Sequence, residues 1–149
     1  MVVIFLDFDG VLHPYAPWPF TEEGRRGHFQ HLPRLEAVLR DFPAARIVIA
    51  SDWRFHHSID ELRAHFSPDI QPRVIGTTAR DRQSGVVFGH RHLLAERFLS
   101  DSGLSGIPWI AIDDTEENYL AHSPLVLCGD CFSDDSAALL RKMLRKTIA

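Results

Sequence analysis

Short apolar runs alternate along the chain with segments in which apolar residues recur at helical spacing. An uninterrupted apolar run of five or so residues is typical of a strand buried on both faces of a sheet. The runs predict five strands: Val2–Asp7, Arg46–Ser51, Arg73–Gly76, Trp109–Asp113 and Leu125–Cys128. A proline precedes each of the last two strands, and proline is well tolerated where a strand begins.

The intervening segments predict four helices: Pro33–Asp41, Ser58–Phe66, His90–Leu99 and Asp134–Ile148. In the first of them, Leu35, Val38 and Leu39 recur at helical spacing after a proline at the helix start. Ser58 followed three residues later by Glu61 is the pattern of a capping box. The last segment begins with acidic residues and ends with basic ones, an order that matches the helix dipole.

Alternation of strands and helices predicts an α/β fold with a doubly wound, mostly parallel five-stranded sheet. The length favours one domain over residues 1–149. Between the first strand and the first helix lies segment 13–32, which is rich in proline and aromatic residues. It is too short for a large cap domain but long for a plain loop. We interpret it as a flap that selects the substrate, and an inert surface loop is the alternative.

Composition excludes several classes of protein. Apolar residues make up 45% of the chain and charged residues 24%, which is typical of a globular protein. A net charge of −4 argues against non-specific binding to nucleic acids. No apolar run approaches the roughly 18 residues that span a bilayer, and the first one lacks the basic flank of a signal peptide. We therefore expect a soluble, cytoplasmic protein with no membrane partner, in which Cys128 and Cys131 are inert and unbridged.

Acidic pairs follow two of the predicted strands. Asp7 and Asp9 end the first strand, and residues two apart on an extended chain point to the same side. Asp113 and Asp114 end the fourth strand. Doubly wound sheets bind ligands at the carboxyl ends of their strands, so we expect the four carboxylates to share a cation. Mg²⁺ prefers such oxygen ligands. The alternative is that each pair belongs to a solvated loop.

A different set of polar residues follows the second strand. Ser51 and Asp52 come first, and Trp53 and Arg54 are next. A serine hydroxyl there can hydrogen-bond a phosphoryl oxygen, and the arginine adds a cation. In the alternative interpretation the serine caps a helix and the arginine is solvated. We expect Ser51, Asp52 and Arg54 to contact the substrate, together with His13, which lies next to the turn after the first strand.

These motifs together resemble the haloacid dehalogenase superfamily of phosphohydrolases. The resemblance depends on the segment DFDGVLHP at Asp7–Pro14, on the apolar strand that ends in Ser51, and on the Asp113-Asp114 pair. The sequences VLHP and SDWR are similar to those of the branch found in Swiss Army Knife RNA-repair proteins. The resemblance implies an Mg²⁺-dependent phosphomonoester hydrolase that acts through an aspartyl-phosphate. Its partner would be a phosphorylated small molecule, a nucleotide or a nucleic-acid end.

The resemblance also implies a role for each matching residue. Asp7 would be the nucleophile. Asp9 would protonate the leaving oxygen and then deprotonate water, while its backbone carbonyl would bind Mg²⁺. Ser51 would bind a phosphoryl oxygen. Asp114 would bind Mg²⁺ directly, with Asp113 nearby or bound through water.

One position departs from the superfamily pattern. The third motif usually supplies a lysine, but no lysine lies between Ser51 and Asp113. We expect an arginine in its place: Arg91, or alternatively Arg80 or Arg82. Without such a cation the protein would be a catalytically weak phosphate- and metal-binding module, which is the alternative function. A signalling receiver domain would need a lysine on its last strand and a phospho-acceptor in mid-chain, and this chain has neither.

Overall fold

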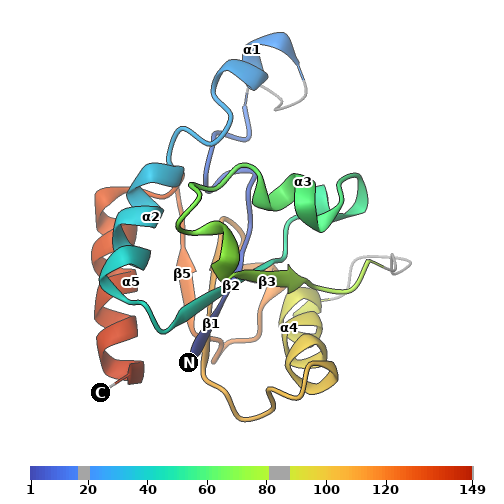
Figure 1. The fold of residues 1–149 in the computed structure, drawn as a ribbon, viewed down its shortest axis with the longest axis vertical. Coiled ribbons are helices and arrows are strands. Elements are labelled where there is room, and N and C mark those ends of the chain that lie inside the picture. Colours follow the sequence, from blue (N-terminus) through green and yellow to red (C-terminus); the bar gives the residue numbers. More distant parts are fainter. Residues whose placement is uncertain (17–20, 81–87, 149) are drawn as a thin grey trace.

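A parallel five-stranded sheet forms the centre of the computed structural model, which describes residues 1–16, 21–80 and 88–148 (Figure 1). Every neighbouring pair of strands is parallel, in the order β3-β2-β1-β4-β5. The strands are β1 (Val2–Leu6), β2 (Ala45–Ile49), β3 (Val74–Thr77), β4 (Trp109–Asp113) and β5 (Leu125–Leu127). The chain thus winds outward from β1 in both directions, which confirms the predicted doubly wound α/β fold.

Helices cover both faces of this sheet (Figure 1). They are α1 (Glu22–Arg26), α2 (Leu32–Asp41), α3 (Ile59–Arg63), α4 (His90–Asp101) and α5 (Asp134–Ile148), with short 3₁₀ helices η1 (Asp52–Phe55), η2 (Gln71–Arg73) and η3 (Glu116–Asn118). Helices α2, α3 and α5 contribute to the apolar cluster on one face, and α4 contributes to the cluster on the other. Within the described residues, no helix is both long and apolar enough to cross a membrane.

The central position of β1 in the sheet explains why its sequence is apolar without interruption. Val2, Ile4 and Leu6 belong to the larger cluster, whereas Val3 and Phe5 belong to the smaller one beneath α4. All five side chains are completely buried. A strand covered on both faces has no solvent-facing position, so polar residues first occur where the strand ends.

Helix α3 is shorter than the predicted segment Ser58–Phe66. The capping box at its start is present, because Ser58 Oγ accepts a hydrogen bond from Glu61 N and Glu61 Oε1 accepts one from Ser58 N. After Arg63 the chain tightens, and Phe66 N donates to the Arg63 carbonyl oxygen three residues earlier. Helix α1 was not predicted from the sequence, because its five residues have no apolar periodicity.

Backbone hydrogen bonds continue just past the ends of β1, β2 and β4 and bring these ends to the same edge of the sheet. Asp7 N donates to the Ile112 carbonyl at 3.0 Å, and Ala50 N donates to the Leu6 carbonyl at 2.9 Å. Leu6 is in register with both Ile49 and Ile112. The residues that follow β1, β2 and β4 therefore meet at one edge of the sheet.

Both cysteines lie beyond this edge, after β5, and they are buried and unbridged. Burial raises the pKa of Cys128 to about 11 and also raises the pKa of Cys131. The reactive form of cysteine is the thiolate, so both shifts lower the reactivity of these thiols near neutral pH.

Adjacent leucines of α5 provide a test of the core. Leu140 is completely buried in the larger cluster, whereas Leu139 is 41% exposed. We expect Leu140→Ala to lower the free energy of unfolding by about 3 kcal/mol, because it leaves a cavity. Leu139→Ala should change it by less than about 1 kcal/mol. Urea unfolding monitored by circular dichroism measures both values, and equal losses would contradict the assigned burial.

Candidate active site

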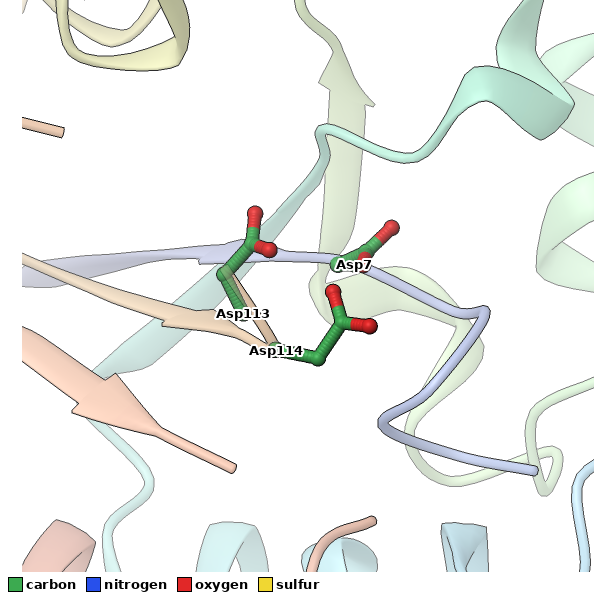
Figure 2. A group of neighbouring side chains, drawn as sticks. All are labelled: Asp7, Asp113 and Asp114. Carbon is green, nitrogen blue, oxygen red and sulfur yellow. The ribbon is translucent and has the colours of Figure 1, made fainter. Parts of the chain in front are cut away.

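Three carboxylates gather at the carboxyl ends of β1 and β4 (Figure 2). Asp7, Asp113 and Asp114 each offer one oxygen, and these oxygens all lie within 4.8 Å of one another. Asp7 is 5% exposed and Asp113 is fully buried. The parallel register of β1 and β4 creates this proximity, as the sequence predicted, because Asp7 and Asp113 each follow the last paired apolar residue of a strand.

The turn after β1 brings the backbone close to Asp114. Gly10 has a φ of +77°, a backbone conformation that residues with a side chain rarely adopt. A Cβ atom at this position would lie 2.2 Å from Asp114 Oδ2. Glycine is therefore required here both by the backbone conformation and by the carboxylate that packs against it.

The guanidinium of Arg91 joins carboxylates from separate elements. Its Nη1 lies 3.2 Å from Asp7 Oδ1 and donates a hydrogen bond to Asp113 Oδ2. Its Nη2 lies 3.5 Å from Asp52 Oδ1. The Arg91 side chain is 11% exposed. Of the three arginines proposed from the sequence, Arg91 is thus the one that the structure places against Asp7; Arg80 is exposed.

Arg82 lies outside the described residues, as do residues 17–20 of the predicted flap. The described part of segment 13–32 includes Tyr15, which is 56% exposed, and the short helix α1. In Figure 1 α1 stands apart from the sheet.

Electrostatics at the carboxylate cluster follow from burial. Desolvation raises the pKa of Asp7 well above its usual range, and the negative charges of Asp113, Asp114 and Asp9 raise it further. Arg91 opposes this shift without cancelling it. Burial likewise raises the pKa of Asp113. Burial alone would lower the pKa of Arg91, but Asp7 and Asp113 together raise it. One guanidinium therefore does not fully compensate the carboxylates around it.

A cavity of about 340 Å³ opens beside this cluster. Its described lining comprises Asp7, Asp9, Tyr15, Asp52, Arg91, Asp114, Thr115 and Asn118. Four of these residues are carboxylates and only one is a cation. Tyr15, Thr115 and Asn118 are not among the site residues predicted from the sequence. Tyr15 lies in the predicted flap, and the other two closely follow the second acidic pair, which was the available signal.

Asp9 lies at the rim of this cavity, with its side chain 16% exposed. Its Oδ1 accepts hydrogen bonds from His13 Nε2 at 2.7 Å and from Trp53 Nε1 at 2.9 Å. From the sequence, Trp53 was expected beside the site but had no predicted role. An indole after an acidic motif has no periodic signature, so only the tertiary structure reveals the contact.

Three residues expected to contact the substrate are buried and are not among the described residues that line the cavity. Ser51 is fully buried, and its Oγ accepts a hydrogen bond from Trp53 N at the start of η1. Arg54 is 2% exposed and donates to the carbonyl oxygens of Ala50, Ser51 and Ala79. Burial lowers the pKa of Arg54 to about 10. His13 is 1% exposed. Of the four expected contacts, Asp52 alone is among the described residues that line the cavity.

The donor set suits Mg²⁺. This cation binds oxygen ligands at about 2.1 Å, so ligand oxygens lie roughly 3 to 4 Å apart around it. The 4.8 Å limit on the oxygens of Asp7, Asp113 and Asp114 is close to that range. Arg91 contacts Asp7 through Oδ1, which leaves Asp7 Oδ2 available to a cation. Asp114 uses Oδ1 to accept a hydrogen bond from Thr115, which leaves Oδ2.

The fold and the site together define a Rossmann-like α/β protein with an acidic cavity at the carboxyl ends of its central strands. The chain belongs to the family described as the HAD (haloacid dehalogenase) domain in Swiss Army Knife RNA repair proteins, whose model matches residues 3–131. The matched range includes all the described residues that line the cavity, and the match confirms the resemblance stated from the sequence. No curated protein matches the chain.

The raised pKa of Asp7 predicts how stability depends on pH in the absence of a cation. The folded protein retains a proton on Asp7 at pH values above the ordinary pKa of 3.8. This contribution to stability is complete below pH 3.8 and is lost as the pH rises through the folded-state pKa. Relative to Asp7→Asn, the wild type should therefore gain stability between pH 7 and pH 5, by at most about 1.4 kcal/mol per pH unit.

Urea unfolding in the presence of a chelator at pH 5, 6 and 7 measures this difference. Asp101→Asn is a matched control, because it removes the same charge at an exposed position on α4. This control should keep the wild-type dependence on pH. A wild type and an Asp7→Asn variant with parallel pH profiles would contradict the prediction.

Proposed function

We propose that the protein is an Mg²⁺-dependent phosphomonoester hydrolase that acts through an aspartyl-phosphate. The observation that carries this proposal is the placement of a buried Asp7 between Arg91 and Asp114, at a cavity that Asp9 also lines. This arrangement supplies a nucleophile, an acid and positive charge around one space. Family membership supports it, because the family model matches residues 3–131, a range that includes all four residues.

Asp7 and Asp114 would bind the cation, with the backbone carbonyl of Asp9 as the third protein ligand that the family pattern implies. When bound, Mg²⁺ neutralises charge on the phosphoryl oxygens and on the carboxylates. The cavity needs such a charge, because four carboxylates and one guanidinium would otherwise repel a phosphate dianion. A nearby divalent cation also favours the ionised, nucleophilic form of Asp7.

In the first step a carboxylate oxygen of Asp7 attacks phosphorus, and the bond from phosphorus to the ester oxygen breaks. Asp9 gives its proton to the departing oxygen. In the second step water attacks the phosphorus of the aspartyl-phosphate, and Asp9 takes a proton from that water. The bond between Asp7 and phosphorus then breaks, which releases inorganic phosphate and restores both carboxyl groups.

Arg91 orients Asp7 and offers positive charge to the phosphoryl group. Its ion pair with Asp7 Oδ1 fixes the orientation of this carboxylate at the cavity. Ser51 is fully buried and is not among the described residues that line the cavity, so it is assigned no phosphoryl contact. Its Oγ caps η1, the 3₁₀ helix after β2, by accepting a hydrogen bond from Trp53 N. Arg54 supports this loop from behind through its bonds to backbone carbonyls.

The substrate proposed is a phosphomonoester, with nucleic-acid ends as the first class to screen because the family description names RNA repair. The alternative function, a catalytically weak phosphate- and metal-binding module, was motivated by the missing lysine. Arg91 lies beside Asp7 and supplies the cation whose absence motivated that alternative. A protein that binds Mg²⁺ but releases no phosphate from aryl, alkyl, nucleotide or RNA-end esters would be that module.

Asp7→Asn tests the nucleophile. We expect wild-type protein to release phosphate from p-nitrophenyl phosphate with Mg²⁺ and to lose this activity with a chelator. Asp7→Asn should lower the rate by at least about 10³-fold, because an amide cannot form the phosphorylated intermediate. Asp101→Asn serves again as the matched control and should retain activity. Phosphate release by Asp7→Asn at the wild-type rate would refute the assignment.

Arg91 offers a second test. Arg91→Met should lower kcat/KM by at least about 10²-fold, because it removes the positive charge beside the nucleophile. Arg91→Lys keeps the charge but not the planar set of donors, so we expect a loss of about 10-fold. Arg80→Met removes an exposed arginine and is the control. Wild-type kinetics for Arg91→Met would show that another cation serves Asp7.

A further inference from the structure

The carboxyl group of Asp9, the proposed acid, receives its described hydrogen bonds at one of its two oxygens. Both neighbouring donors, His13 Nε2 and Trp53 Nε1, reach the same oxygen, Oδ1. Among the described residues, none makes a hydrogen bond to Oδ2. The two donors come from different elements: His13 follows the turn after β1, and Trp53 belongs to η1 after β2. The carboxyl group is thus oriented by the ends of two neighbouring strands.

A backbone contact determines which nitrogen of His13 carries its proton. Phe29 N donates a hydrogen bond to His13 Nδ1 at 3.2 Å. A backbone amide can only donate, so Nδ1 is the acceptor and has no hydrogen. A neutral His13 therefore carries its proton on Nε2, the atom that faces Asp9. The loop residue Phe29 fixes His13 as a donor to the acid.

The backbone of Phe29 adopts a conformation that is unusual for a residue other than glycine. Its φ is +60°, in the left-handed region that favours glycine. Such conformations persist where the surroundings determine them, and they cluster at functional sites. The ring of Phe29 packs against His13 at 5.2 Å and Trp53 at 5.3 Å between centroids. The strained residue thus also packs against the two side chains that bind Asp9.

Burial makes this assembly rigid and dry. His13 is 1% exposed and Trp53 is 3% exposed. Their rings lie 5.5 Å apart between centroids and leave neither donor open to solvent. Water therefore does not replace either hydrogen bond to Asp9 easily, and the carboxyl group keeps one orientation.

We propose that His13 and Trp53 are positioning residues that hold Asp9 Oδ1 and so present Oδ2 to the leaving oxygen. This inference rests on the proposed function and adds residues to that same site. With two N–H donors directed at Oδ1, the transferable proton has its place on Oδ2. In the first step that proton passes to the leaving oxygen as the bond from phosphorus breaks. In the second step Oδ2 accepts a proton from the attacking water.

The leaving group distinguishes such positioning from a general structural role. A nitrophenolate leaves as a stable anion and needs little protonation, whereas an alkoxide depends on it. The test is a comparison of kcat/KM for p-nitrophenyl phosphate and for an alkyl phosphate such as glycerol 2-phosphate, both with Mg²⁺. His13→Leu and Trp53→Phe should lower the value for the alkyl ester by about 10- to 100-fold, and for the aryl ester by less than about threefold.

His13→Gln is the rescue variant. The glutamine amide nitrogen can donate from near the position of Nε2, so this variant should recover most of the alkyl-ester activity. His65→Phe is the matched control within the same aromatic group. It keeps the ring that stacks on Phe29 at 4.1 Å between centroids, and its side chain is exposed. This variant should keep the wild-type ratio of the two kcat/KM values, and thermal melts verify that each variant folds.

Each outcome has a distinct meaning. A ratio of alkyl to aryl activity that falls in His13→Leu and Trp53→Phe and recovers in His13→Gln supports the inference. An equal loss on both esters, or an unchanged ratio, overturns it while the phosphatase assignment stands. A wild-type protein that is inactive on both esters overturns the proposed function and the inference together.

Discussion

The site depends on the interaction between one guanidinium and the carboxylates buried around it. Asp7 and Asp113 occupy positions that the sheet places together, and both residues are buried. Arg91 contacts both, and it also reaches Asp52 from η1. A planar guanidinium can serve several acceptors in fixed directions, whereas an ammonium group is a single point of charge. An arginine at this place therefore fits a site with acceptors on three elements.

The first turn of helix α4 carries basic residues, which do not stabilise the start of a helix but do place Arg91 against the carboxylates. His90, Arg91 and His92 form its first turn, where the helix dipole favours acidic side chains. The preceding Gly89 has a φ of +72°, and its amide donates to the Glu117 carbonyl at 3.0 Å. The start of α4 is thereby joined to η3, close to the end of β4. Unfavourable placement along the helix is offset by the carboxylates that Arg91 meets.

Periodicity and motif spacing predicted the sheet and the acidic cluster, because both follow from strand register. Once β1 and β4 are parallel neighbours, Asp7 and Asp113 must share an edge, whatever the loops do. The orientation of Arg54 could not be predicted in this way. A cation after a strand is usually solvated, but here carbonyl oxygens from two chain segments satisfy its donors and allow its burial. That compensation exists only in the folded chain.

The same distinction separates Asp9 from its neighbours. Its place after β1 follows from the sequence, but its orientation depends on Phe29, which lies sixteen residues beyond His13 in a loop without periodic pattern. The returning end of segment 13–32 is fixed further by the hydrogen bond from His31 N to the Leu12 carbonyl at 2.9 Å. A segment interpreted from the sequence as a flap over the substrate is thus, at its base, joined to the residues that orient Asp9. The described residues of this segment thus border the cavity through Tyr15 and fix the orientation of His13 through Phe29.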